Sequence, residues 1–236
     1  SKDDSNSFAF TQKNMLYIYK NFESEEVLTN NGYLAEFSDL SIKTIFLEEA
    51  ITKPGNEESI KLDDIYFVFD TRVLRDLRQM MESNVILDDI YNYCVKHNHP
   101  KLWDLFIKHC MLKLEFNIAE KCLIQQQDFI GLNLLKRIKN MDDDDFKRAE
   151  IYQHFFDYDK AEEIYKNKER KDILIKMRIK LGNWGKVIDL IQESQVVQED
   201  ELKIALNNQA MQYLENLEYH KAEELFSKTG NKEELI

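Results

Sequence analysis

Two cysteines and two histidines stand close enough in the sequence to suggest a metal site. Cys94, His97, His99 and Cys110 follow the spacing C-x2-H-x-H-x10-C, and thiolates and imidazoles are the ligands that zinc prefers. This spacing matches no standard zinc pattern, however, and Cys94 and Cys110 both lie on apolar helical stripes. Core cysteines beside a polar histidine turn are therefore the favoured interpretation, and we predict no metal.

The acidic run Asp142–Asp145 could suggest calcium. It lacks the alternating ligand spacing, the glycine turn and the distal glutamate of an EF-hand loop. We interpret the run as the acidic N-terminus of a helix, where the helix macrodipole favours negative charge.

Lys203 and Asn207 lie four residues apart in a helical pattern and could form half of a clamp for a peptide carboxylate. A working clamp needs matching cations on neighbouring hairpins, which the sequence does not place, so ordinary solvated positions are the favoured interpretation. A glycine-rich phosphate loop, a nucleophile elbow and a paired-carboxylate arrangement do not stand out either. We therefore predict a protein that is not an enzyme, with no catalytic residues and no cofactor.

The charge balance narrows the classes of partner. A net charge of −12 over 236 residues and a pI near 5.0 disfavour binding to nucleic acid or to an anionic membrane, since both need a basic surface. The three cysteines form no paired framework, which is typical of a reducing compartment. With no long apolar run and no signal-peptide pattern, the sequence predicts a soluble intracellular protein without membrane insertion.

A short phrase recurs in the chain and indicates how its helices are organised. An aromatic residue is followed three positions later by a small residue, which opens an apolar helical face. The spacing of the copies scatters around the roughly 34-residue period of TPR-type hairpins. We expect the small residue to let two helices approach closely and the aromatic residue to fill the hairpin corner. The four pairs are Phe116 with Ala119, Tyr158 with Ala161, Trp184 with Val187, and Tyr219 with Ala222.

Residues 1–69 are predicted to form short strands. Strands 26–29 and 33–37 flank Asn30-Asn31-Gly32, which is a hairpin signal because Asn and Gly tolerate positive φ. The loop Lys53–Asn56 separates the last two strands. Such strands alone would leave a sheet face uncovered, and the chain does not begin with Met. We therefore expect a fragment whose first third ends a larger β domain, such as the final blade of a β-propeller, although a small sandwich would fit equally.

Residues 70–236 are predicted to form a TPR-like α-solenoid. The hydrophobic period changes from 2 to 3.6 at Asp70-Thr71, either of which could cap the first helix. Stripes that include Leu181 and Leu217 indicate further helices, over 172–181 and 202–217 among others. No polar capping repeat closes the pattern, so we expect the solenoid to continue beyond Ile236. The predicted fold is mostly α, a β-strand segment followed by a truncated solenoid.

An ordered set of motifs over most of residues 34–236 resembles the WD-repeat protein 35 family, whose members are subunits of intraflagellar transport complex A. The set begins with Arg75-Asp76 inside the run 71–78 and continues with His99-Pro100-Lys101-Leu102-Trp103. The remaining pieces are Ala119-Glu120, the run 170–174 and the run 178–184.

The resemblance implies two β-propellers followed by a TPR-like solenoid, with residues 1–69 at the end of the second propeller. It implies a scaffold in the ciliary train that carries retrograde transport and helps membrane proteins to enter cilia. The implied partners are other complex A subunits and, indirectly, ciliary membrane-protein cargo. The implied locations are the cilium, its basal body and the cytoplasm.

The residues alone, without the resemblance, are also compatible with three other classes of protein. The chain could belong to another propeller–solenoid vesicle coat, or to a TPR adaptor that captures one short peptide in a concave groove. It could also be the helical accessory domain of an enzyme.

Overall fold

The computed structural model describes residues 1–46, 66–83, 85–193 and 199–230. The chain divides into two compact units, Ser1–Lys139 and Asn140–Ile236, each of which is described by itself. The division falls among the helices, whereas the change from strands to helices falls near residue 70, so the predicted domain boundary there stays a prediction. The predicted loop Lys53–Asn56 lies outside the described residues.

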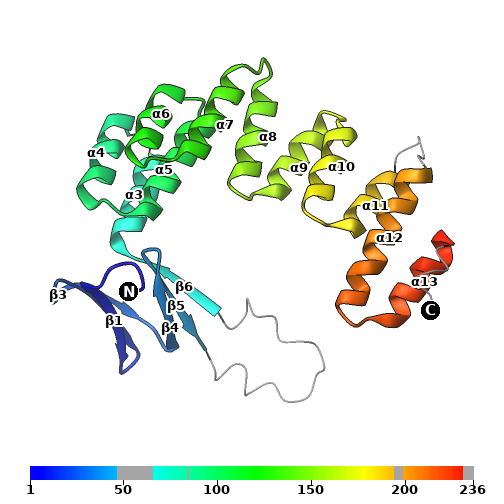
Figure 1. Ribbon diagram of the computed structural model, residues 1–236. Helices are drawn as coiled ribbons and strands as arrows, with labels where there is room; N and C mark the ends of the chain where they lie inside the picture. Colours follow the sequence, from blue (N-terminus) through cyan, green and yellow to red (C-terminus); the bar gives the residue numbers. More distant parts are fainter. Residues whose placement is uncertain (47–65, 84, 194–198, 231–236) are drawn as a thin grey trace. The chain divides into compact units, whose positions relative to one another are not determined.

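The described strands form two antiparallel sheets of three strands each, ordered β1-β2-β3 and β4-β5-β6 (Figure 1). Three hairpins turn through two residues that both have positive φ, namely Lys13-Asn14, Asn21-Phe22 and Asp39-Leu40. That geometry suits the right-handed twist of paired strands. The strands are β1 (Ser7–Gln12), β2 (Met15–Lys20), β3 (Glu23–Thr29), β4 (Tyr33–Ser38), β5 (Ser41–Ile45) and β6 (Tyr66–Asp70).

The hairpin predicted at Asn30-Asn31-Gly32 is wrong, because the strands on its two sides belong to different sheets. The Asn30 side chain instead builds a corner between the sheets. Its amide donates to the carbonyl of Gly32 at 2.9 Å and its oxygen accepts from the N–H of Gly32 at 3.0 Å. The two sheets share a small core of Leu16, Ile18 and Ile42. The strands therefore extend over more than the single blade that the sequence suggested.

Among the described residues of the first unit, five helices follow β6. The first begins one residue after Thr71, which occupies the N-cap position without a side-chain capping bond. Its buried face is Val73, Leu74 and Leu77. The helices are α3 (Arg72–Glu82), α4 (Leu87–His97), α5 (Pro100–Leu112), α6 (Phe116–Gln125) and α7 (Phe129–Lys139).

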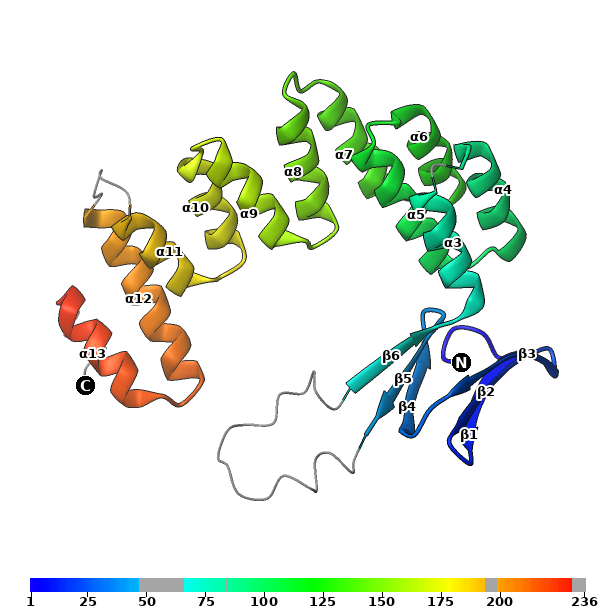
Figure 2. The same ribbon diagram turned by 180° about the vertical axis from the view of Figure 1, so that it is seen from behind.

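Six helices make up the described part of the second unit, and α12 and α13 lie side by side in both views (Figures 1 and 2). Two predicted stripe residues lie outside the helices that they were assigned to. Leu181 is an exposed C-cap, and Leu217 has a φ of 63° and is 69% exposed. The helices are α8 (Asp144–His154), α9 (Tyr158–Asn167), α10 (Lys171–Lys180), α11 (Trp184–Gln192), α12 (Glu199–Glu215) and α13 (Tyr219–Thr229).

The helices are joined by a repeated corner. At six corners a residue with positive φ ends one helix, and the next residue donates its N–H to the carbonyl five positions earlier, at 2.8–3.0 Å. This is the Schellman type of helix ending. Glycine, which takes this conformation without strain, is used at only one of the six. The residues with positive φ are Leu114, Gln127, Phe156, Glu169, Gly182 and Leu217.

Candidate interaction surfaces

The cysteines that suggested a metal site are buried in the helical core, and one of the histidines caps the start of a helix. Burial raises the pKa of the Cys94 thiol to about 12 and raises that of Cys110 as well, so neither is a ready thiolate ligand. His99 caps α5 by accepting from the N–H of Lys101 at 3.2 Å. In the parts of the chain that the structure describes, no cluster of three or more His, Cys, Asp or Glu side chains is placed to hold a metal.

The acidic run is the capped start of α8. The Asp143 carboxylate accepts from the backbone N–H groups of Asp145, at 2.8 Å, and Phe146, at 3.3 Å. A hydrogen bond from Lys168, at 3.0 Å, is the main reason that the pKa of Asp143 lies below its ordinary value. Lys168, at the end of α9, also pairs with Asp145 at 2.9 Å, and within α8 Lys147 pairs with Asp144 and Arg148 with Asp145.

The proposed half-clamp does not form one group. Lys203 is exposed, whereas the Asn207 side-chain oxygen accepts from the hydroxyl of Thr229 at 2.7 Å. Asn207 therefore ties α12 to α13.

The residues that carry the family resemblance hold the junction between strands and helices. Arg75 donates to the carbonyl of Asp70 at 2.6 Å and forms an ion pair with Glu26 of β3. Arg78 pairs with the side chain of Asp70 at 3.0 Å. Asp76 faces Arg72 one helical turn away, at 3.9 Å. The contacts of Arg75 and Arg78 link the start of α3 to both sheets.

The second motif begins α5. His99 is its N-cap and Pro100 its first residue, where the missing N–H of proline is harmless. Leu102 and Trp103 are fully buried, and the Trp103 ring meets Tyr91 edge-on with centroids 5.5 Å apart. This motif therefore starts and packs the central helix of the first unit.

The repeated phrase marks helix starts. Each of its aromatic residues is the first residue of its helix, and each small residue three positions later is buried. The aromatic residues Phe116, Tyr158 and Trp184 are half-buried, whereas Tyr219 is 61% exposed and does not fill its corner. The buried residues are Ala119, Ala161, Val187 and Ala222.

An ion cluster built around a buried arginine joins three helices of the second unit. Arg178 of α10 is only 4% exposed. Its guanidinium donates to Glu162 of α9 at 2.8 Å and to Asp159 at 3.2 Å, and Lys186 of α11 lies 3.6 Å from Asp159. Burial acts to raise the pKa of Glu162, but hydrogen bonds from Lys166 and Arg178 outweigh it and lower the pKa. The cluster is satisfied within this chain.

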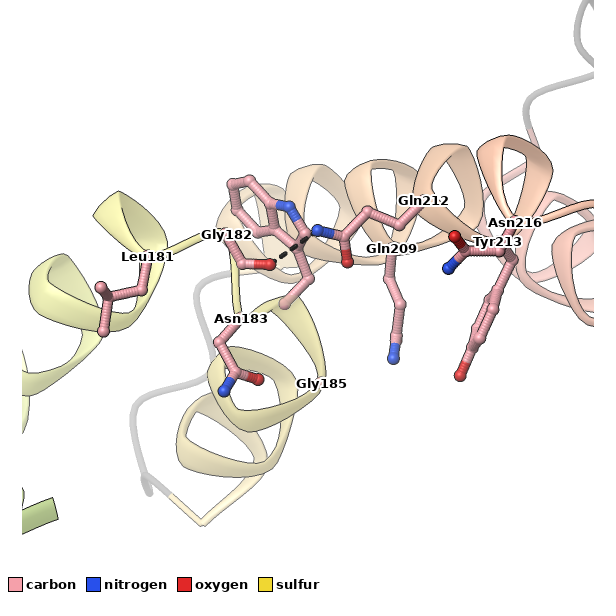
Figure 3. A pocket seen from close by; sticks show the side chains of 9 residues that line it. Leu181, Gly182, Asn183, Gly185, Gln209, Gln212, Tyr213 and Asn216 are labelled. Carbon is pink, nitrogen blue, oxygen red and sulfur yellow. Dashed lines mark hydrogen bonds between the residues drawn. The ribbon is translucent and has the colours of Figure 1, made fainter. Parts of the chain in front are cut away.

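A hollow in this unit is lined without charged side chains, and we call it the amide hollow. It has a volume of about 380 Å³ and lies between the α10–α11 corner and α12 (Figure 3). The Gln212 side-chain amide donates to the carbonyl of Gly182 at 2.7 Å. The lining residues are Leu181, Gly182, Asn183, Trp184, Gly185, Gln209, Gln212, Tyr213 and Asn216.

The comparisons with known proteins decide the family. A family model described as WDR35 second beta-propeller matches residues 1–65. WD repeat-containing protein 35 from Mus musculus is 29% identical over all 236 residues, which is 20% of that protein. The protein of the same name from Homo sapiens is 30% identical over 208 residues, 88% of this chain and 17% of the relative. The chain belongs to the WD repeat-containing protein 35 family.

The fold of this WD repeat-containing protein 35 family member is accordingly the end of a β-propeller followed by TPR-like helical hairpins. The match includes residues 1–33, which lie outside the part of the chain that contains the family-like motifs. The chain spans about a fifth of the length of the curated relatives that it matches. None of the helices that the structure describes combines the length and apolar character needed to cross a bilayer.

Sequence reasoning missed both features of the second unit that are built from polar side chains. Arg178 lies in the motif run 178–184, but arginine is mostly exposed in proteins, so the sequence gives no sign that it is buried. Gln209, Gln212 and Asn216 are spaced by three and four residues, which places them on one helical face. That spacing was a usable signal for the amide hollow.

Proposed function

We propose that this chain is part of a non-enzymatic scaffold subunit of the intraflagellar transport complex A train. In that role it supports retrograde ciliary transport and the ciliary entry of membrane proteins through protein–protein contacts. Its partners are the other complex A subunits, and its contact with membrane-protein cargo is indirect. It acts at the cilium and its basal body, and in the cytoplasm. The observation that carries the proposal is the match to WD repeat-containing protein 35 along the whole chain, across the junction of strands and helices.

Two structural features support a scaffold. Arg75 and Arg78 tie the first helix to the strands, so the end of the propeller and the start of the helices are held as one part. Repeated hairpins present long helical faces, and such faces distribute binding over large interfaces.

The test is affinity purification of the full-length protein from ciliated cells, followed by mass spectrometry. Co-purification of the other complex A subunits in near-equal amounts is the expected result. Recovery of vesicle-coat subunits without ciliary proteins would overturn the proposal and favour a different propeller–solenoid coat.

A further inference from the structure

We propose that the amide hollow binds a short, extended and uncharged stretch of main chain from a neighbouring subunit. This inference rests on the proposed function, because a scaffold subunit has neighbours that can supply such a segment. It adds to that function a defined contact point and a defined chemistry.

The hydrogen-bonding groups of the hollow match those of a peptide group. A carboxamide offers donors and an acceptor, as the backbone does. Gln209 and Asn216 lie on the α12 side of the hollow (Figure 3). Within the described residues neither side chain has a hydrogen-bond partner, so both can bind an occupant. From residue 209 to 216 the helix rises by roughly 10 Å, which corresponds to about three residues of extended chain.

The absence of charged side chains from the lining favours an uncharged occupant. None of the nine lining residues is acidic or basic, although 32% of the chain is charged. A charged side chain or a phosphate brought into this hollow would find no counter-ion among the lining residues, and desolvating it would be unfavourable. Lys221, which lies over the Tyr213 ring at 5.4 Å, is already paired with Glu218. The neighbouring ion cluster of Arg178 shows the contrast, because its charges already neutralise one another.

The shape favours an extended chain over a helix. A helix with its side chains is about 10 Å wide, and a volume of about 380 Å³ is small for it. Gly182 and Gly185 contribute no side chains to the hollow, which is lined on that side by Leu181, Asn183 and Trp184. A Cβ added at Gly185 would lie 3.2 Å from the Gln209 side-chain nitrogen, so any larger side chain there would occupy the space of the ligand.

The test uses the full-length protein in ciliated cells, with an aromatic photo-crosslinking residue in place of Tyr213, another lining residue, and mass spectrometry of the products. The expected product joins position 213 to a contiguous, uncharged stretch of one other protein. Gly185→Leu should reduce this product about tenfold by filling the hollow. The matched control Gln192→Leu, on an exposed carboxamide at the other end of α11, should leave it unchanged.

A second variant keeps the test valid if Gly185→Leu fails to fold. The double variant Gln209→Leu, Asn216→Leu removes hydrogen-bonding groups that have no partner in the described chain, and it should reduce the product about tenfold. Products that persist in both variants, or that lie on a helix or a charged segment, would overturn the inference, as would the lack of any intermolecular product. If complex A subunits fail to co-purify but an uncharged extended segment of another protein is cross-linked, the proposed function fails and the docking chemistry stands.

Discussion

Replacing Arg178 with methionine should loosen the packing of α9 against α10. The Arg178 side chain is 5% exposed, and its guanidinium donates to Glu162, whose side chain is 12% exposed. Removing one partner of a buried pair costs about 3–5 kcal/mol, because the other charge is left uncompensated. Lys166 stays 2.8 Å from Glu162 and Asp159 is exposed, so we expect about 2–3 kcal/mol here.

Hydrogen exchange of the full-length protein, read by mass spectrometry, measures this effect locally. A loss of about 2–3 kcal/mol corresponds to exchange about 30- to 150-fold faster in peptides from α9 and α10. The control is Arg148→Met, which breaks a pair with Asp145 at 3.3 Å in which both side chains are well exposed. That change should cost less than about 1 kcal/mol.

A double variant separates a buried pair from general packing loss. Arg178→Met with Glu162→Met replaces both charges by apolar groups of similar volume, a change that is often close to neutral. We therefore expect the double variant to exchange more slowly than Arg178→Met alone. Single variants with wild-type exchange rates, or a double variant whose loss equals the sum of the single losses, would refute this account of the cluster.

Three smaller changes test other parts of the second unit. Ala161→Leu should destabilise α9 by about 1–3 kcal/mol through overpacking, seen as faster hydrogen exchange, since Ala161 is fully buried. Gly182→Ala should cost about 1 kcal/mol by the same measurement, because φ is +65° there while the added methyl group meets only ordinary contacts. The hydrogen bond from Arg170 lowers the pKa of Asp172 to about 2. Its stabilising effect is complete above the ordinary value of 3.8 and is lost as the pH falls toward 2, and in an NMR titration Arg170→Gln should move the pKa back toward 3.8.

The sequence predicted helices well because a buried stripe leaves a periodic trace. Leu74, Leu77 and Trp103 are buried as the 3.6-residue period requires. The same period led us to predict two helices that were too long, ending at Leu181 and Leu217. An apolar residue just beyond a helix end continues the pattern, while the backbone has already turned.

Strand pairing was less predictable because a turn signal does not say which strands it joins. Asn30 and Gly32 do form a turn, but that turn passes between sheets. The hairpin turn at Asp39-Leu40 has positive φ at both residues without any glycine. The pairing of the flanking strands imposes that conformation, and a leucine gives no local sign of it.

The Arg178 cluster and the amide hollow differ in what they do for stability. Glu162 and Arg178 stabilise each other, so changing either one alone should weaken the fold. Gln209 and Asn216 have no partner among the described residues, so leucine at these positions removes no bond within the described part of the chain. Leucine there should therefore leave local hydrogen exchange unchanged or slower while it weakens docking. Changing Arg178 or Glu162 should therefore speed hydrogen exchange, whereas changing Gln209 and Asn216 should reduce cross-linking to the partner without speeding exchange. This difference in response distinguishes a site that stabilises the fold from a site that binds a partner.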